Sequence, residues 1–186
     1  MSPRQRFRDL EARLPKTRDA LAYAEQRHAG QRRKADGAPF IEHPLEVAWL
    51  LYSVGAPDHV IAAGALHDTL EKTDADIAEL RSRFGARTAR LVIAVSEDPG
   101  ITSYARRKAA LRAQVAAAGH EALMVFAADK ISKVREVGPQ SKLPRRRLTH
   151  YRRCLELLER RLTGSPLVVQ LRTELDRVTA PRPALA

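Results

Sequence analysis

The stretch HDTLEK, residues 67–72, follows an apolar run at residues 60–66. On a helix, His67 and Glu71 lie four positions apart and Asp68 and Glu71 lie three apart, so the imidazole and both carboxylates share one face. Chance His-Asp pairs are common and usually lie at the surface. This pair instead follows small apolar residues that predict a buried helix, and buried ionisable groups need partners or a metal ion. The stretch therefore predicts a helical fold with a polar site at the end of a buried helix.

Two more groups could complete such a site. Asp129 ends the apolar run at residues 122–128, where a carboxylate needs compensation. His43 precedes Pro44 at the expected start of another helix, and taken alone it is explained more simply as a helix-cap residue. Two histidines and two aspartates form a mixed nitrogen and oxygen set suited to one divalent ion such as Mn²⁺ or Fe²⁺. The spacing matches neither a zinc finger nor an HExxH motif, and no glycine-rich phosphate loop is present.

The composition indicates a globular, helical protein. The 186 residues are 44% hydrophobic and 30% charged but only 5% aromatic, so alanine, leucine, valine and isoleucine must fill most of the core. Alanine and leucine favour helix, whereas the β-branched and aromatic runs of a sheet protein are scarce. Cys154 is the only cysteine, so no disulfide can form within the chain. No signal segment or membrane span is evident, and we expect a cytoplasmic protein without a membrane partner.

Helix-period apolar patterns predict one all-α domain over residues 1–186, a compact bundle of roughly nine helices. Its core would span about residues 18–163, followed by a helix at 166–178 and a frayed tail at 181–186. The other helices are expected at residues 18–29, from His43-Pro44 to a break at Gly55-Ala56-Pro57, from residue 60 into His67-Asp68, from a cap at Thr73 or Asp74 to Phe84-Gly85, and at residues 86–95, 104–118, 121–137 and 148–162.

The net charge of +11 predicts an anionic partner. Residues 58–98 contain eight acids and five bases, whereas residues 142–161 contain eight bases and two acids. A basic surface facing an acidic metal-binding region suits a phosphate-rich small ligand, although a solvated basic helix face would show the same pattern. No recognition motif or stacking aromatic accompanies the run at 145–147, which disfavours nucleic acid. The remaining histidines are expected at the surface or on helix faces: His28, His59, His120 and His150.

Several separated motifs occur in a consistent order between about Leu21 and Tyr151. They are HAGQRRKADGAPFIEHP at 28–44, GALHDTLEKT at 64–73, FG at 84–85, the Arg- and Lys-rich stretch at 105–114, and AADK at 127–130. In this order they resemble the HD-domain hydrolases of bacterial stringent-response alarmones, of the RelA/SpoT type, and especially the stand-alone small alarmone hydrolases. That family releases pyrophosphate from the 3′ position of the ribose, so the resemblance implies a hydrolase of (p)ppGpp or (p)ppApp.

The resemblance also implies roles for individual residues. His43, His67, Asp68 and Asp129 would hold one Mn²⁺. Arg33 and Lys34 would contact the base and the phosphates, and Arg147 and Tyr151 would reach the sugar-phosphate end of the substrate. In such chemistry a carboxylate orients the attacking water and cationic side chains neutralise phosphate charge. Self-assembly and a toxic alarmone synthetase as partner are both left open by the sequence.

Two positions depart from the family pattern. The usual catalytic pair is Glu-Asp, and here it is Glu71-Lys72. The usual Asn four residues after the metal ligand Asp129 is Lys133 here, and this lysine would bind substrate phosphate. Lys72 could pair with Asp68 across one helical turn, a contact worth ~0.3–0.5 kcal/mol if exposed. It could bind phosphate in an enzyme with a different substrate, or mark a site that binds nucleotide without hydrolysing it. We expect an active hydrolase, because all four metal positions and Glu71 are kept.

Overall fold

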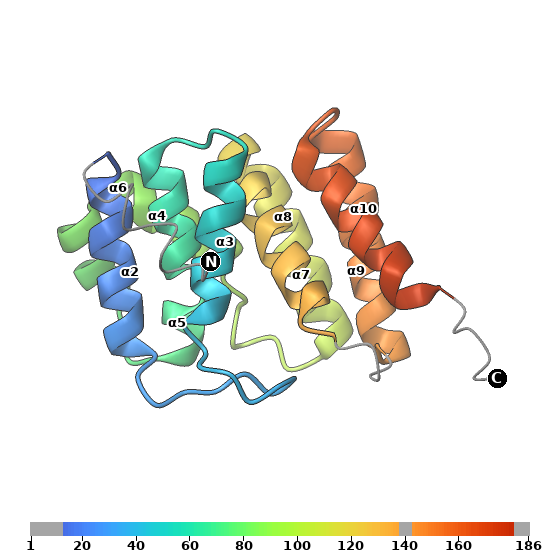
Figure 1. Ribbon diagram of the computed structural model, residues 1–186, viewed down its shortest axis with the longest axis horizontal. Helices are drawn as coiled ribbons and strands as arrows, with labels where there is room; N and C mark the ends of the chain where they lie inside the picture. Colours follow the sequence, from blue (N-terminus) through green and yellow to red (C-terminus); the bar gives the residue numbers. More distant parts are fainter. Residues whose placement is uncertain (1–12, 138–142, 181–186) are drawn as a thin grey trace.

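The computed structural model of the protein describes residues 13–137 and 143–180, and this part of the chain is all-helical (Figure 1). It contains eight helices of nine residues or more and the single-turn helix α5, while its β-structure is limited to one isolated bridge between Arg32 and Pro39. The helices are α2 (Pro15–Arg27), α3 (Glu42–Ser53), α4 (Asp58–Leu66), α5 (Thr69–Lys72), α6 (Ile77–Val95), α7 (Tyr104–Ala118), α8 (His120–Arg135), α9 (Arg145–Arg161) and α10 (Pro166–Thr179). The predicted all-α bundle is confirmed.

Two buried helices form the centre of the bundle. Helix α4 packs against α2, α3, α6 and α8, and every residue from Val60 to Leu66 is buried. Helix α8 packs against α3, α7, α9 and α10, and its apolar residues at 122–128 are buried apart from the partly buried Met124. Removing this aliphatic surface from water is the main force that holds the bundle together. The residues that follow the two runs, His67-Asp68 and Asp129, are thereby placed in the core.

The helix boundaries agree with the sequence-based expectation at some positions and differ at others. Helix α7 has the predicted bounds, whereas α2 begins three residues before the predicted Arg18. Pro15 suits a first turn, and the Asp58 carboxylate accepts hydrogen bonds from the backbone of Lys16 (3.0 Å) and Thr17 (2.9 Å). The sequence could not indicate this cap because Asp58 lies on another helix. The single-turn α5, which follows α4 after His67 and Asp68, was not predicted as a separate helix, and α6 joins two predicted helices. The other helices begin and end within three residues of the predicted positions.

The region after the HDTLEK stretch differs more from the prediction. The predicted caps Thr73 and Asp74 are wrong, because Asp76 caps α6 by accepting from the backbone of Glu79 at 2.9 Å. The predicted break after Phe84 is present, since Gly85 has a φ of 86° and bends α6. The frayed tail predicted at 181–186 lies outside the described residues, and the single domain over 1–186 stays a prediction. None of the described helices is long and apolar enough to cross a membrane.

Gly64 permits the close approach of α4 and α3. A Cβ atom there would overlap Leu51 Cδ1 and lie 3.2 Å from Val47 Cγ1. We expect Gly64→Ala to lower the free energy of unfolding by about 1–3 kcal/mol, as overpacking of a core does. Urea denaturation measures the loss. In a Leu51→Ala background the added methyl has room, so the penalty should largely disappear; simple additivity of the two changes would contradict the explanation.

Candidate metal centre

Hydrogen bonds fix the orientation and tautomer of two buried imidazoles. His67 Nδ1 donates to the carbonyl oxygen of Gly64 at 2.7 Å, so the other ring nitrogen, Nε2, is free to act as a ligand. His43 Nδ1 lies 2.8 Å from Ser132 Oγ, and this hydroxyl donates its own proton to Glu46 Oε2 at 2.7 Å. Ser132 therefore accepts from His43 Nδ1–H, and His43 Nε2 is likewise available. Outer partners of this kind are typical of metal-binding histidines.

The two available nitrogens and two carboxylate oxygens converge on one point. His43 Nε2 and His67 Nε2 are 3.0 Å apart, and Asp129 Oδ1 lies 3.2 and 3.4 Å from them. Asp68 Oδ2 lies 3.5 and 3.4 Å from the same nitrogens. Within the described residues, both carboxylate oxygens are buried and accept no hydrogen bond, although Lys133 forms an ion pair with Asp129. His43, His67 and Asp129 each offer one donor atom within 4.8 Å of the others, a set that fits a divalent cation, and Asp68 Oδ2 lies beside the two histidines as a candidate fourth donor.

The electrostatics of the centre favour positive charge. Burial alone would lower the pKa of His67, but the charge of Asp68 and the Asp129 carboxylate 3.4 Å from Nε2 outweigh it and raise that pKa to about 9. Burial would likewise raise the pKa of Asp68, yet Lys133 and the imidazoles hold it well below its usual range. The pKa of Asp129 is also well below its usual range, because Lys130 and Lys133 outweigh the effect of burial. The carboxylates are therefore ionised and available to a metal ion.

Lys133 supplies part of this positive charge from the rim of the centre. Its Nζ lies 2.8 Å from Asp129 Oδ1 and 3.8 Å from Asp68 Oδ1, and its side chain is 28% exposed. The sequence-based expectation gave Lys133 to the substrate phosphate, and the side chain does line the adjoining cavity. Its ion pairs, however, are with two of the predicted metal ligands. Lys133 is therefore an internal counter-cation of this centre.

We expect Lys133→Met to bind Mn²⁺ about tenfold more tightly than the parent chain, because a like charge beside the ion is removed. The metal-free variant should melt at a lower temperature, since two buried carboxylates lose a counter-charge. Calorimetric titration with Mn²⁺ and thermal unfolding in a chelator measure the two effects. Lys133→Arg keeps the charge and serves as the control. Equal or weaker Mn²⁺ affinity in Lys133→Met would contradict this role.

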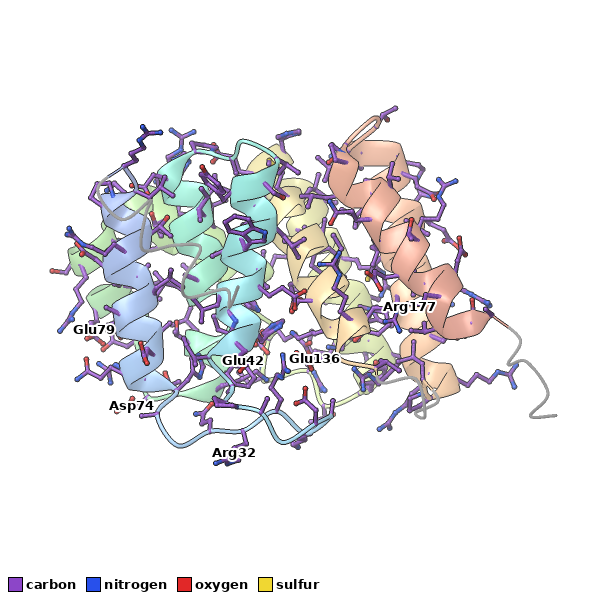
Figure 2. All side chains as sticks on the ribbon, viewed as in Figure 1. Arg32, Glu42, Asp74, Glu79, Glu136 and Arg177 are labelled. Atoms are coloured by element: carbon purple, nitrogen blue, oxygen red, sulfur yellow. The ribbon has the colours of Figure 1, made fainter. Side chains whose placement is uncertain are left out.

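A basic cavity of about 690 Å³ adjoins the metal centre at His43. Five basic residues proposed from the sequence line it: Arg33, Lys34, Lys72, Lys133 and Arg147. The predicted Tyr151 is not part of this lining; it is buried, and its hydroxyl lies 3.1 Å from Arg147 Nη2, which donates to it. Arg32 and Glu136 also line the cavity, and Figure 2 shows them with Glu42 at the end of the bundle where the loop before α3 passes below α3 and α8.

The two residues at the catalytic pair have different surroundings. Lys72 Nζ lies 5.4 Å from the centre of the Phe40 ring, and no described carboxylate forms an ion pair with it. The local Lys72–Asp68 pair is therefore not formed, and Lys72 instead adds charge to the basic cavity. Glu71 is exposed, and its Oε1 accepts from the backbone N–H of Glu97 at 2.8 Å. That contact orients the Glu71 carboxylate.

Sequence reasoning missed several residues that support the centre. Ser132 lies three positions after Asp129 on α8, so helical spacing could have drawn attention to it. Glu46 lies three positions after His43 and offered the same signal. Lys130 forms an ion pair with the Asp129 carboxylate and lies over the Phe126 ring, 4.4 Å from its centre. Its charge beside a metal ligand was visible in the sequence, but its burial was not.

This helical bundle, with two histidines and two aspartates at its centre, defines a known class of protein. A family model described as "HD domain" matches residues 20–155, and the chain belongs to that family. It is related to ppGpp pyrophosphohydrolases of the MESH1 and SpoT type.

Individual relatives support this relationship. The chain is 38% identical over 125 residues to proteins named guanosine-3′,5′-bis(diphosphate) 3′-pyrophosphohydrolase MESH1 from Danio rerio and Homo sapiens, covering 64% of this chain and 67% and 68% of those proteins. A probable enzyme of the same activity from Synechocystis is 46% identical over 78 residues, which are 42% of this chain but 10% of that much longer protein.

Solved structures agree with the fold. The structure of a metazoan orthologue of SpoT, described as hydrolysing ppGpp, superposes with a TM-score of 0.73 at 26% identity, covering 87% of this chain and 94% of that one. A crystal structure from Listeria monocytogenes gives a TM-score of 0.65 at 26% identity, covering 75% of this chain and 95% of that one.

Proposed function

We propose that the protein is a Mn²⁺-dependent 3′-pyrophosphohydrolase that acts on (p)ppGpp or (p)ppApp. The observation that supports this most is the convergence of two imidazole nitrogens and two buried carboxylate oxygens beside a cavity lined by six basic residues. The activity for which the MESH1 relatives are named agrees with it. An assembly of several chains and a toxic synthetase as partner stay separate predictions.

Four residues would hold the divalent ion: His43, His67, Asp68 and Asp129. A bound ion would supply Lewis-acid chemistry at the phosphate ester. Mn²⁺ suits a site with two nitrogen and two oxygen donors, and Fe²⁺ is the next candidate. Lys133 and Lys130 both pair with the Asp129 carboxylate, so a bound ion would compete with them for that ligand.

The chain's own side chains would position the substrate and move the proton. Arg33, Lys34 and Arg147 would bind phosphate groups in the basic cavity, where guanidinium groups can make paired hydrogen bonds to phosphate oxygens. Glu71 would take a proton from the water whose oxygen attacks phosphorus. The bond from phosphorus to the ribose 3′ oxygen would break, and that oxygen would take up a proton from solvent as it leaves. Lys72, as a cation, cannot accept this proton and would neutralise phosphate charge.

One observation favours a second candidate, a non-catalytic or altered-specificity nucleotide-binding HD protein. Lys72 replaces a carboxylate of the usual catalytic pair and makes no ion pair with any described residue. It thereby raises the positive charge of the cavity, which strengthens anion binding without providing a proton acceptor. Such a protein would bind alarmones tightly and turn them over slowly or not at all.

Incubation of the purified protein with Mn²⁺ and ppGpp, pppGpp or ppApp, followed by ion-exchange separation, tests both candidates. The hydrolase should release pyrophosphate and the nucleotide with a free 3′ hydroxyl, and the His67→Ala protein should not. Binding in calorimetry without product would favour the non-catalytic candidate. If the protein neither binds nor hydrolyses any of the three nucleotides, both proposals are overturned.

A further inference from the structure

A second basic cavity lies between α7 and α9, at the end of the bundle remote from α2 (Figure 1). This α7–α9 cavity has a volume of about 510 Å³ and shares no lining residue with the cavity beside His43. Its lining contains no acidic residue and five basic ones: Lys108, Arg112, Arg145, Arg146 and Arg153. Tyr104, Ala105, Thr149 and His150 complete it. The proposed hydrolase reaction uses none of these residues.

Most of this charge is uncompensated. Lys108 forms an ion pair with Glu97, but among the described residues none of the four arginines pairs with a carboxylate. Arg146 lies over the Tyr104 ring, 5.3 Å from its centre. The side chains of Arg145 and Arg153 make no hydrogen bond, ion pair or ring contact with any described residue. Arginines gathered around one cavity repel each other, so an anion bound between them is favoured.

A buried histidine orients one of the arginines. His150 is 5% exposed, and its Nδ1 lies 2.9 Å from Arg112 Nη1. A guanidinium group can only donate, so His150 accepts through Nδ1 and is neutral. Burial, together with the charges of Lys130 and Lys108, lowers the pKa of His150 to about 2. The Arg112 guanidinium is thus held at the cavity by a neutral acceptor that does not cancel its charge.

The start of α9 adds further positive electrostatic potential to the cavity. Arg145 and Arg146 occupy its first turn, where there is no acidic residue and no side-chain cap. Free backbone N–H groups at a helix start attract anions, whereas basic side chains there are unfavourable without an anionic partner. An anionic ligand would accept hydrogen bonds from the free N–H groups and would also offset the charge of the basic side chains.

We propose that the α7–α9 cavity is a second anion site that binds the di- or triphosphate group of a small ligand. Several arginines without acidic neighbours match a multiply charged phosphate chain, and arginine is the residue best suited to paired phosphate contacts. The volume is within the usual range of small-ligand sites. A single-stranded RNA would need exposed aromatic faces for base stacking, but Arg146 and Lys108 both lie over the Tyr104 ring.

Calorimetric titration of the full chain with inorganic tripolyphosphate, GTP and a short single-stranded RNA tests this site. Arg145→Gln/Arg153→Gln changes two side chains without described partners, so it should fold normally. Arg33→Gln/Lys34→Gln is the matched control, with two charges removed from the other cavity. We expect two classes of tripolyphosphate sites in the parent chain. The Arg145/Arg153 change should weaken one class by about tenfold or more, and the control should leave that class intact.

The comparison of ligands identifies the source of the phosphate chain. Tighter binding of GTP than of tripolyphosphate at the affected class would assign a nucleotide, and equal binding would assign the phosphate chain alone; either supports the proposal. Two results would overturn it. The first is unchanged tripolyphosphate binding in both Arg145→Gln/Arg153→Gln and a second variant, Arg112→Gln/Arg153→Gln. The other is a loss confined to RNA binding, which would make this surface an RNA interface.

Discussion

The His67→Ala protein should bind Mn²⁺ at least about 100-fold more weakly than the parent chain. Loss of outer partners alone weakens metal sites by about 10–100-fold, and loss of a ligand removes more. His67 Nε2 lies 3.0 Å from His43 Nε2 and 3.4 Å from oxygens of Asp68 and Asp129, so its removal opens one side of the centre. Metal content after dialysis against buffered Mn²⁺ measures the loss, and the rise in melting temperature that Mn²⁺ gives the parent should vanish too.

The same substitution at a partly buried histidine outside the centre provides the control. His59 lies on α4, and its Nε2 is 3.1 Å from Glu121 Oε1, away from the metal centre. His59→Ala should keep full Mn²⁺ content, even if it costs some stability. Asp129→Ala should behave like His67→Ala, although it also leaves Lys133 without its nearest carboxylate. Undiminished metal in both His67→Ala and Asp129→Ala would exclude this centre as the metal site.

The sequence predicted those parts of the centre that depend on local helix chemistry. The apolar runs before His67 and before Asp129 indicated burial, and both runs belong to the two central helices. His43 was harder to assign, because a histidine next to a proline at a helix start is explained more simply by capping. The structure instead buries it completely, with Nε2 facing His67.

The remaining features depend on contacts between distant segments. Ser132 orients His43 across 89 positions, and Glu97 binds Glu71 across 26, so neither partnership has a local signature. His28 and His150, expected at the surface or on helix faces, are both buried. His150 is buried because it lies on a face of α9 that packs against the rest of the bundle, where α9 contacts α7 and α8. Helical spacing predicts which residues share a face but not which neighbour that face meets.

Glu71→Gln should reduce kcat on the order of 10²–10⁴-fold, while Lys72→Ala should chiefly raise KM. Glutamine keeps an oxygen that can accept from the Glu97 backbone N–H, now 2.8 Å from Glu71 Oε1, so the local structure should survive. What is lost is the ability to take a proton from water, which accounts for an effect of that size. Lys72 makes no ion pair with described residues and lines the basic cavity, so its removal takes away phosphate binding.

Lys72→Asp separates an active enzyme from a decayed one, because it recreates the usual carboxylate pair beside Glu71. Steady-state kinetics with ppGpp and Mn²⁺ should give unchanged or higher kcat than the parent chain, with weaker substrate binding as a positive charge is replaced by a negative one. A gain of activity from an inactive parent would assign the protein to the nucleotide-binding, non-catalytic class. If the parent is active and Glu71→Gln stays equally active, Glu71 is not the proton acceptor, and the water must be deprotonated by another group.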